Sequence, residues 1–284
     1  MNVHSLALTT DLALARTRGT VTDRDDYLVV ETPDDPGYCH GNFLVMPAPP
    51  QLGEVGFWSR RFADELGHKP GIDHIAFRWD GTTGDAGAVD ELLAAGFAIE
   101  QVQLLTSTRL AAQEASLPIR ALSPDEVLAT ADLAWTIGDR HDETFRGFLQ
   151  RRAAWHRELV VRGIARFHGA FDADSLDPTA LPSGSASGSA CGALVASLGL
   201  VELGAVARYQ DVQTHAAYRG RGLASALLVA AAEAARAPTL AIVAERGSIA
   251  ARVYERVGFR AVESSASACR YPPGVSARPS RSRS

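Results

Sequence analysis

The fold of this chain is decided by the stretch Asp211-Val212-Gln213-Thr214-His215-Ala216-Ala217-Tyr218-Arg219-Gly220-Arg221-Gly222-Leu223-Ala224. A β-type run over residues 205–214 leads into a short turn, and an unbroken helix rich in Leu and Ala follows it. The two glycines of the turn let a ligand approach the main chain with no Cβ in the way. Because unpaired amides and the helix dipole favour anions at a helix N-terminus, the stretch predicts a phosphate-binding turn.

This turn resembles a motif of a known family. Arg219-x-x-Gly222-x-Ala224 is similar to the Q/R-x-x-G-x-G/A turn with which the GNAT superfamily of acyl-CoA N-acyltransferases holds the pyrophosphate of coenzyme A. Further along, residues 250–259 resemble the family's helix that ends in Tyr-x-x-x-Gly-Phe, here Tyr254 to Phe259. The two motifs stand in the family's order, separated by about a strand and a loop. The second half of the chain is therefore identified as a member of the GNAT superfamily.

The composition narrows the class of protein. Hydrophobic residues make up 46% of the 284 residues and charged residues 21%, which is typical of a soluble globular protein. The net charge of −5 predicts no nucleic-acid partner and no membrane partner, and residues 1–10 predict no leader or membrane span. Cys39, Cys191 and Cys269 are too scattered for a disulfide framework, and the eight histidines show no metal-ligand spacing. We therefore expect a cytoplasmic protein without a metal.

The chain divides near residues 116–118 into two halves. In the first half, strands are predicted at 27–31, 41–46, 74–79 and 98–105, and helices at 54–66 and 86–95. The segment 90–97 echoes 252–259, because both run from a helix through Gly-Phe into a strand. The fold class we predict is α/β, of the α+β type, with tandem GNAT-like domains. Each domain is a mixed, mostly antiparallel sheet flanked by helices.

The predicted domains are a degenerate GNAT-like domain over residues 1–116, a GNAT N-acetyltransferase domain over 117–271, and a disordered tail over 272–284. The first copy lacks the glycine turn and has Leu93 at the position of Tyr254, so it is not expected to bind the cofactor in the usual way. The elements of the second half are predicted as strands at 119–122, 165–171, 191–200 and 205–214, helices at 125–137 and 142–161, and a flexible insertion at 174–190.

The resemblance implies acetyl-CoA as co-substrate, held by the main-chain amides of the turn and by a splayed strand that pairs with the pantetheine arm. Gly247 stands where many relatives have an Asn that contacts the cofactor. The cofactor-binding candidates are Val212, Gln213, Thr214, Arg219, Gly220, Arg221, Gly222, Leu223, Ala224 and Gly247.

Tyr254 is the candidate catalytic residue. A phenol on a helix beside the thioester can donate its proton to the departing sulfur and so act as a general acid. The alternative is a tyrosine of the core, with a buried ring and a satisfied hydroxyl.

The sequence leaves the general base open. Many relatives carry a Glu on one of two strands, but residues 207–210 and 240–243 contain none, and Glu202 and Glu245 stand only at strand ends. A water relay is the remaining route. An acidic cluster between the first two helices of the second half is the candidate acceptor-binding group, because it would attract a cationic amine. Its members, Asp139, His141, Asp142 and Glu143, also suit an ordinary helix N-terminus.

The expected function is an acetyl-CoA-dependent N-acetyltransferase that moves an acetyl group to a primary amine through a direct ternary complex. A small-molecule amine and a protein N-terminus are both open as acceptor. The alternative is a non-catalytic acyl-CoA-binding or regulatory module. A third idea, nucleic-acid binding, rests on the Arg/Ser-rich residues 278–284. The oligomeric state is not indicated by the sequence.

Overall fold

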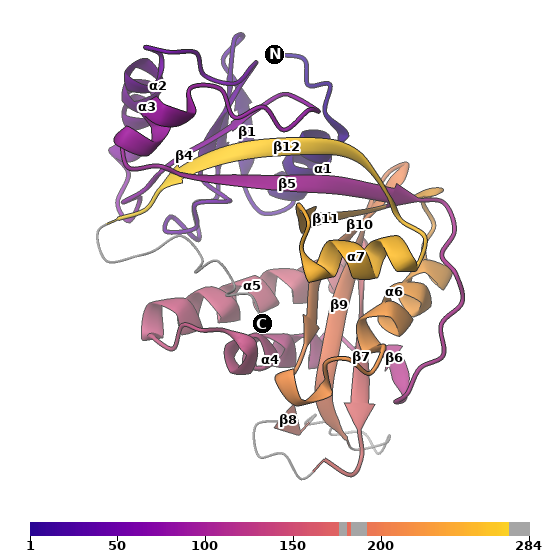
Figure 1. Cartoon of the computed structure of the whole chain (residues 1–284). Helices are drawn as coiled ribbons and strands as arrows, with labels where there is room; N and C mark the ends of the chain where they lie inside the picture. The colour runs from indigo at the N-terminus through magenta and orange to yellow at the C-terminus, as the bar shows by residue number, and fades with distance from the viewer. Residues whose placement is uncertain (176–180, 183–191, 273–284) are drawn as a thin grey trace. The chain divides into compact units, whose positions relative to one another are not determined.

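The computed structural model describes residues 1–175, 181–182 and 192–272 (Figure 1). Its backbone packs into two compact units. Of the described residues, the first contains Met1–Leu104, Val243–Arg246 and those from Ala261 to Pro272, and the second contains those within Leu105–Ile242 and Gly247–Arg260. The domain limits expected from the sequence stay a prediction, because a unit defined by packing need not coincide with a domain defined by descent.

The first unit is built on a mixed sheet. Its strands lie in the order β1-β2-β3-β4-β12-β5, where β3 and β4 are parallel while β1–β2, β2–β3 and β4–β12 are antiparallel. Most of the last strand of the chain, β12, therefore belongs to this unit. The elements are α1 (Leu6–Ala15), β1 (Thr20–Asp23), β2 (Leu28–Glu31), β3 (Phe43–Met46), α2 (Val55–Phe62) continued by a π-helical turn (Ala63–Gly67), β4 (Ile75–Trp79), α3 (Val89–Ala94), β5 (Ala98–Ser107) and β12 (Arg260–Arg270).

The core of this unit lies on both faces of its sheet. Along β3 the side chains alternate between the faces, as the pleat of a strand requires. Leu44 and Met46 pack with α2 and α3 in one cluster, whereas Phe43 and Val45 pack with α1 in another. All four of these side chains are almost fully buried. Helices covering both faces explain why this strand reads as an unbroken apolar run.

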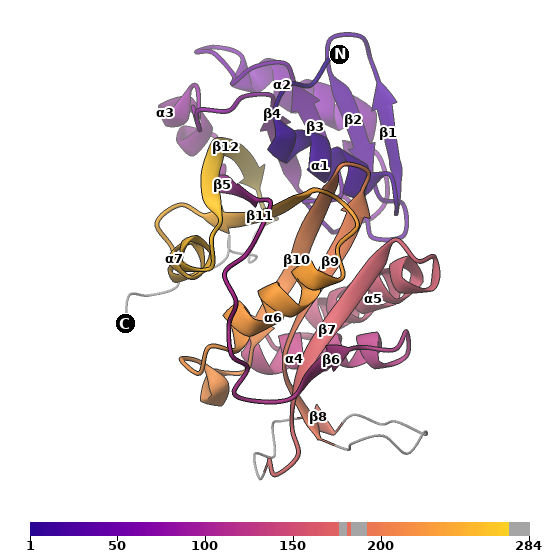
Figure 2. The same cartoon turned by 90° about the vertical axis from the view of Figure 1, so that its right-hand side faces the viewer.

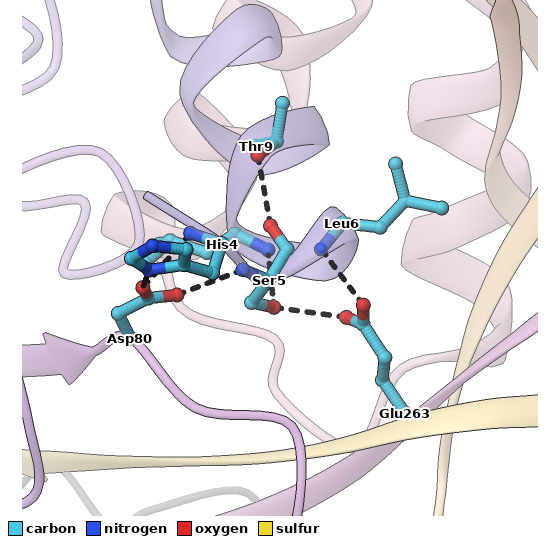
Figure 3. A network of polar contacts seen from close by, with 7 residues as sticks. His4, Ser5, Leu6, Thr9, Asp80 and Glu263 are labelled. Atoms are coloured by element: carbon cyan, nitrogen blue, oxygen red, sulfur yellow. Dashed lines mark hydrogen bonds and ion pairs between the residues drawn. The ribbon is translucent and has the colours of Figure 1, made fainter. Parts of the chain in front are cut away.

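Helix α1 is held at its N-terminus by two carboxylates from distant parts of the chain (Figure 3). Glu263 accepts hydrogen bonds from the N–H groups of Leu6 and Ala7 and from the Ser5 hydroxyl, at 2.9–3.0 Å. Asp80 accepts from the N–H groups of His4 and Ser5, each at 2.8 Å. Burial alone would raise the pKa of the Asp80 carboxyl, but these hydrogen bonds outweigh it and lower the pKa.

Replacing Glu263 by alanine is expected to lower the free energy of unfolding by about 1–3 kcal/mol, because it leaves two amides and a hydroxyl at the helix start without their acceptor. Urea unfolding followed by far-UV circular dichroism measures the change. Asp64→Ala removes an exposed carboxylate from the same unit and is expected to stay within about 0.5 kcal/mol of wild type. Equal stabilities of the two variants would contradict this role of Glu263.

The second unit is a mixed sheet in the strand order β11-β10-β9-β7-β6, with β8 paired to β9. Only β10 and β11 are parallel among its described pairs. Helices α4 and α5 cover one face of the sheet and α6 covers the other (Figure 2). The elements are β6 (Ile119–Ala121), a 3₁₀ turn (Glu126–Leu128), α4 (Ala129–Ile137), α5 (Glu143–Val161), β7 (Ala165–Asp172), β8 (Leu181–Pro182), β9 (Ala193–Leu203), β10 (Val206–Thr214), a 3₁₀ turn (Ala216–Tyr218), α6 (Leu223–Glu233), β11 (Thr239–Glu245) and α7 (Ile249–Arg256).

The predicted fold class is confirmed, since both units are mixed, mostly antiparallel sheets flanked by helices. Helix α1 and strand β1 were not predicted from the sequence. The helix expected over 125–137 begins as a 3₁₀ turn, and the helix expected over 54–66 ends in a π turn. Most of the predicted insertion at 174–190 lies outside the described residues, as does residue 273 onward of the predicted tail. Leu181 and Pro182, inside that insertion, form β8.

The predicted echo between the two Gly-Phe segments is also a structural one. The N–H of Phe97 donates to the carbonyl of Leu92 at 2.9 Å, and the N–H of Phe259 donates to the carbonyl of Tyr254 at 3.1 Å. Both bonds span the same number of residues, both close a helix, and both phenylalanines are buried. This is the Schellman type of helix end, in which a buried residue after Gly packs back on the helix.

Candidate functional site

Strand β10 leaves its parallel neighbour early. Pairing with β11 covers Val206–Arg208 against Thr239–Ala241 and no more of the described strands. On its other side β10 pairs with β9 along most of its length, interrupted by a bulge between Gln210 and Gln213. The second half of β10, which carries the candidates Val212, Gln213 and Thr214, therefore has one edge without a β11 partner. The resemblance implies a splayed strand at this place, and such an edge can accept an added strand.

The turn between β10 and α6 has the conformation that its glycines predict. Gly220 and Gly222 both have φ +77°, a left-handed conformation that side-chain-bearing residues rarely adopt. A Cβ built on either glycine meets no atom within 4 Å, so the space beside this main chain is open. The sequence needs glycine here for its backbone angles, and the open space leaves room for a ligand.

The start of α6 offers unsatisfied donors. The first bond of the helix runs from the N–H of Ala226 to the carbonyl of Gly222, which is the N-cap and has no side chain to cap with. The N–H groups of Leu223, Ala224 and Ser225 consequently have no acceptor within the helix. Three amides pointing out of a helix N-terminus beside two glycines form an anion-binding arrangement.

Side-chain contacts hold this turn to other parts of the second unit. The buried Tyr218 donates its hydroxyl to Asp172 at 2.7 Å, and the guanidinium of Arg221 lies 4.7 Å from the centre of the Tyr218 ring. Ser116 donates to the carbonyl of Arg221 at 3.0 Å. Arg219 is exposed, with only a long contact of 3.4 Å to the carbonyl of Thr214. Of the two candidate arginines, Arg221 is therefore the more firmly held.

Tyr254 lies on α7, which begins at the N-cap Ser248. Its ring is 6% exposed and packs against Phe259, with 6.3 Å between the ring centres. Phe259 also contacts Tyr209 of β10 at 5.7 Å, so an aromatic cluster joins α7 to the strand of the candidate site. Tyr209 donates its hydroxyl to the carbonyl of Leu228 at 2.7 Å, and burial raises the pKa of its phenol. The cluster brings α7 beside β10, while the proton-donor role of Tyr254 stays a prediction.

Gly247 lies in the turn that leads to α7. Its carbonyl accepts a hydrogen bond from Arg252 at 3.2 Å, and a Cβ built on it meets nothing within 4 Å. The open space is compatible with a ligand approaching the main chain there, and its role in cofactor binding stays a prediction.

The acidic cluster lies between α4 and α5, and one member has a structural role. Asp142 is the N-cap of α5 and accepts from the N–H of Phe145 at 2.9 Å. That hydrogen bond, followed by the bonds from Arg140, lowers the pKa of the Asp142 carboxyl. His141 packs edge-on against Trp135, and Asp139 and Glu143 are exposed. The ordinary helix-start alternative thus holds for Asp142, and an acceptor role for the cluster stays a prediction.

Three side chains that meet at the bulge of β10 were not among the candidates from the sequence. The carboxylate of Asp211 lies 3.1 Å from the Nε of Arg152, on α5. His156, one helical turn further along α5, has its Nδ1 at 3.7 Å from the same oxygen. Arg152 and His156 stand four residues apart, a spacing that puts both on one helix face. The sequence shows this spacing, but it contains no pattern that identifies Asp211 as the partner of these two residues.

Among the described residues there is no group of three or more His, Cys, Asp and Glu side chains that could hold a metal ion. Nor does any described helix combine the length and apolar character needed to cross a membrane.

Comparisons with known proteins agree with this geometry. The model of the acetyltransferase (GNAT) domain matches residues 187–261, which include β10, the glycine turn and α7. Together with the fold and the turn, this match supports membership of the GNAT superfamily for the part of the chain that it covers. The comparison with curated proteins gives no match.

Solved structures extend the likeness in fold to nearly the whole chain. A GCN5-related N-acetyltransferase from Kribbella flavida is 14% identical, with a TM-score of 0.60 over 96% of this chain and 98% of its own. A conserved protein of unknown function from Staphylococcus epidermidis is 10% identical, with a TM-score of 0.66 over 89% and 94% of the two chains. A GCN5-related N-acetyltransferase from Sphaerobacter thermophilus is 16% identical, with a TM-score of 0.53 over 89% and 83%. At these identities the likeness concerns the fold alone.

Proposed function

We propose that the protein is an acetyl-CoA-dependent N-acetyltransferase whose second unit transfers an acetyl group to a primary amine. The observation that carries this proposal is the turn before α6. It combines two left-handed glycines, open space beside them and three helix-start amides without helical acceptors. In a member of the GNAT superfamily, this combination fits the pyrophosphate of coenzyme A.

The second half of β10 would hold the other end of the co-substrate. Its edge is free of β11 beyond Arg208, so the amides and carbonyls of Val212–Thr214 can pair with the amide groups of a pantetheine arm as with an added strand. Two fixed points, the turn and the strand edge, restrict the thioester to a small region beside β10. Such restriction contributes to the rate by replacing a random encounter with a fixed geometry.

The chemistry then requires two proton movements. The neutral amine attacks the carbonyl carbon of the thioester, the carbon–sulfur bond breaks, and the amine loses a proton while the thiolate gains one. Tyr254 is the proposed donor to sulfur, because α7 packs beside β10 through the aromatic cluster. The acidic cluster around Asp139 is proposed to attract the cationic acceptor, and water to carry away the proton of the amine.

The alternative function is a non-catalytic module that binds acyl-CoA. It is favoured by the strand segments nearest the candidate site, since residues 207–210 of β10 and 240–243 of β11 contain no carboxylate to act as a base. Both functions require acyl-CoA binding, so turnover is the property that separates them.

Two measurements test the proposal in sequence. Isothermal titration of the purified protein with acetyl-CoA is expected to give one site per chain, with coenzyme A competing for it. A panel of primary amines, covering small polyamines, aminoglycosides and peptides with free N-termini, is then screened for release of the coenzyme A thiol. Binding without thiol release from any amine would favour the non-catalytic module. No binding at all would overturn both functions and leave the motif as scaffold.

A further inference from the structure

The bulge in β10 contains a residue in an unusual conformation. Asp211 and Val212 stand between Gln210 and Gln213, whereas the facing segment of β9 has only one residue between the partners Gly199 and Ser197. Asp211 has φ +48°, the left-handed region that few residues other than glycine, asparagine and aspartate adopt. Bulges of this kind bend a strand and re-aim the groups that follow them. Here the groups that follow Asp211 are the backbone of Val212–Thr214.

The side chain of Asp211 is tied to the neighbouring helix. Its carboxylate lies 3.1 Å from the Nε of Arg152, and the side chains of the two residues are 23% and 19% exposed. His156 has its Nδ1 3.7 Å from the same carboxylate oxygen, and its side chain is only 2% exposed. The His156 ring packs against Phe167 of β7, with 4.7 Å between the ring centres. The ion pair is therefore partly shielded from water and stands against a packed surface, where an electrostatic contact is stronger than on an open surface.

A second ion pair on the same helix, between Arg157 and Asp125, is far more exposed to water than the Arg152–Asp211 pair. Arg157 of α5 lies 3.0 Å from Asp125, but these two side chains are 45% and 84% exposed. Its partner belongs to the segment before α4 and not to the sheet. The chain thus offers two Arg–Asp pairs from one helix at a similar distance, of which only one reaches the bulge.

We infer that Arg152 and Asp211 are positioning residues: their ion pair holds the β10 bulge and so presents the backbone of Val212–Thr214 to the pantetheine arm of acyl-CoA. This inference rests on the proposed function. Aspartate adopts the left-handed region more readily than most residues but still at a cost, so its conformation depends on support from its surroundings. Without the ion pair, the bulge would relax toward an ordinary strand. The amides after the bulge would then face a different direction.

The test compares two ligands on matched variants. Arg152→Met and Asp211→Asn each remove the charge pair with little change in shape, and Arg157→Met removes an equal charge from the exposed pair. Acetyl-CoA and 3′-phosphoadenosine 5′-diphosphate, which lacks the pantetheine arm, are titrated by calorimetry. Arg152→Met and Asp211→Asn are expected to raise the dissociation constant of acetyl-CoA by about 10- to 100-fold. The affinity of the nucleotide fragment is expected to stay unchanged, and Arg157→Met is expected to behave as wild type.

Two further variants test whether the two residues act as one unit and whether the charge of Arg152 is what matters. The double variant Arg152→Met/Asp211→Asn is expected to bind acetyl-CoA no more weakly than either single variant, because the pair acts as one unit. Arg152→Lys retains the charge and is expected to restore most of the affinity lost in Arg152→Met. Acetyl-CoA binding by Asp211→Asn and Arg152→Met at wild-type strength would overturn the inference, and so would an equal loss for both ligands. Wild-type protein that binds neither ligand would instead overturn the proposed function.

Discussion

Replacing Tyr254 by phenylalanine is expected to lower kcat for acetyl transfer by about 100-fold or more while the dissociation constant of acetyl-CoA stays near the wild-type value. The phenol is the proposed proton donor to the leaving sulfur, and this proton transfer occurs only during the reaction. Loss of the hydroxyl therefore removes stabilisation of the transition state and leaves the bound ground state intact. Thiol release at saturating acetyl-CoA and amine measures kcat, and calorimetry measures binding.

The same aromatic cluster supplies the matched control for this substitution. Tyr209→Phe also removes one buried phenol, whose hydroxyl donates to the carbonyl of Leu228 on α6. It is expected to cost about 1 kcal/mol of stability, the value of one hydrogen bond, and to leave kcat unchanged. If Tyr254→Phe turned over at the wild-type rate, Tyr254 would be a tyrosine of the core, as its 6% exposure and its packing on Phe259 also allow.

The parts of the fold that the sequence predicted are those with local causes. The turn before α6 follows from two glycines at fixed positions, and its left-handed angles are those that glycine alone adopts freely. The ends of α3 and α7 follow from Gly-Phe in the same way. The helix-start role of Asp142 was one of the two alternatives given by the sequence, because an N-cap is recognised from the residues next to it.

The parts that escaped prediction depend on partners far away in the chain. Helix α1 is capped by Asp80 and Glu263, which no local pattern connects with residues 4–7. The placement of β12 between β4 and β5 is likewise a property of the completed sheet. The Arg152–Asp211 pair joins a helix to a strand bulge, and a bulge shows no sequence signal when an aspartate, and not a glycine, occupies its left-handed position. The hydrophobic period of a segment indicates which face of the helix or strand is apolar. It does not indicate which polar side chains from distant segments will contact that helix or strand.

Replacing Gly222 by glutamate is expected to reduce the affinity for acetyl-CoA by at least about 100-fold. Gly222 is the N-cap of α6, so the substitution places a carboxylate at the amides proposed to bind the pyrophosphate. One repelled pair of charges at close range in a partly dry site is enough for a loss of this size. The new Cβ meets no atom within 4 Å, so the substitution creates no clash at this atom and its cost in the ligand-free protein is backbone strain. Calorimetric titration with acetyl-CoA measures the change.

Gly204 allows the effect of backbone strain to be separated from the effect on the ligand. It has φ +77°, as Gly222 has, and a Cβ built on it also meets nothing within 4 Å, but it lies in the turn between β9 and β10. Gly204→Glu therefore carries the same strain, about 1–2 kcal/mol, and the same added charge. Both variants are expected to lose similar stability in urea, whereas only Gly222→Glu loses acetyl-CoA. Equal affinities of Gly222→Glu and wild type would mean that the anion does not bind at this turn. The chain would then share the GNAT fold while holding acyl-CoA, if at all, by other contacts.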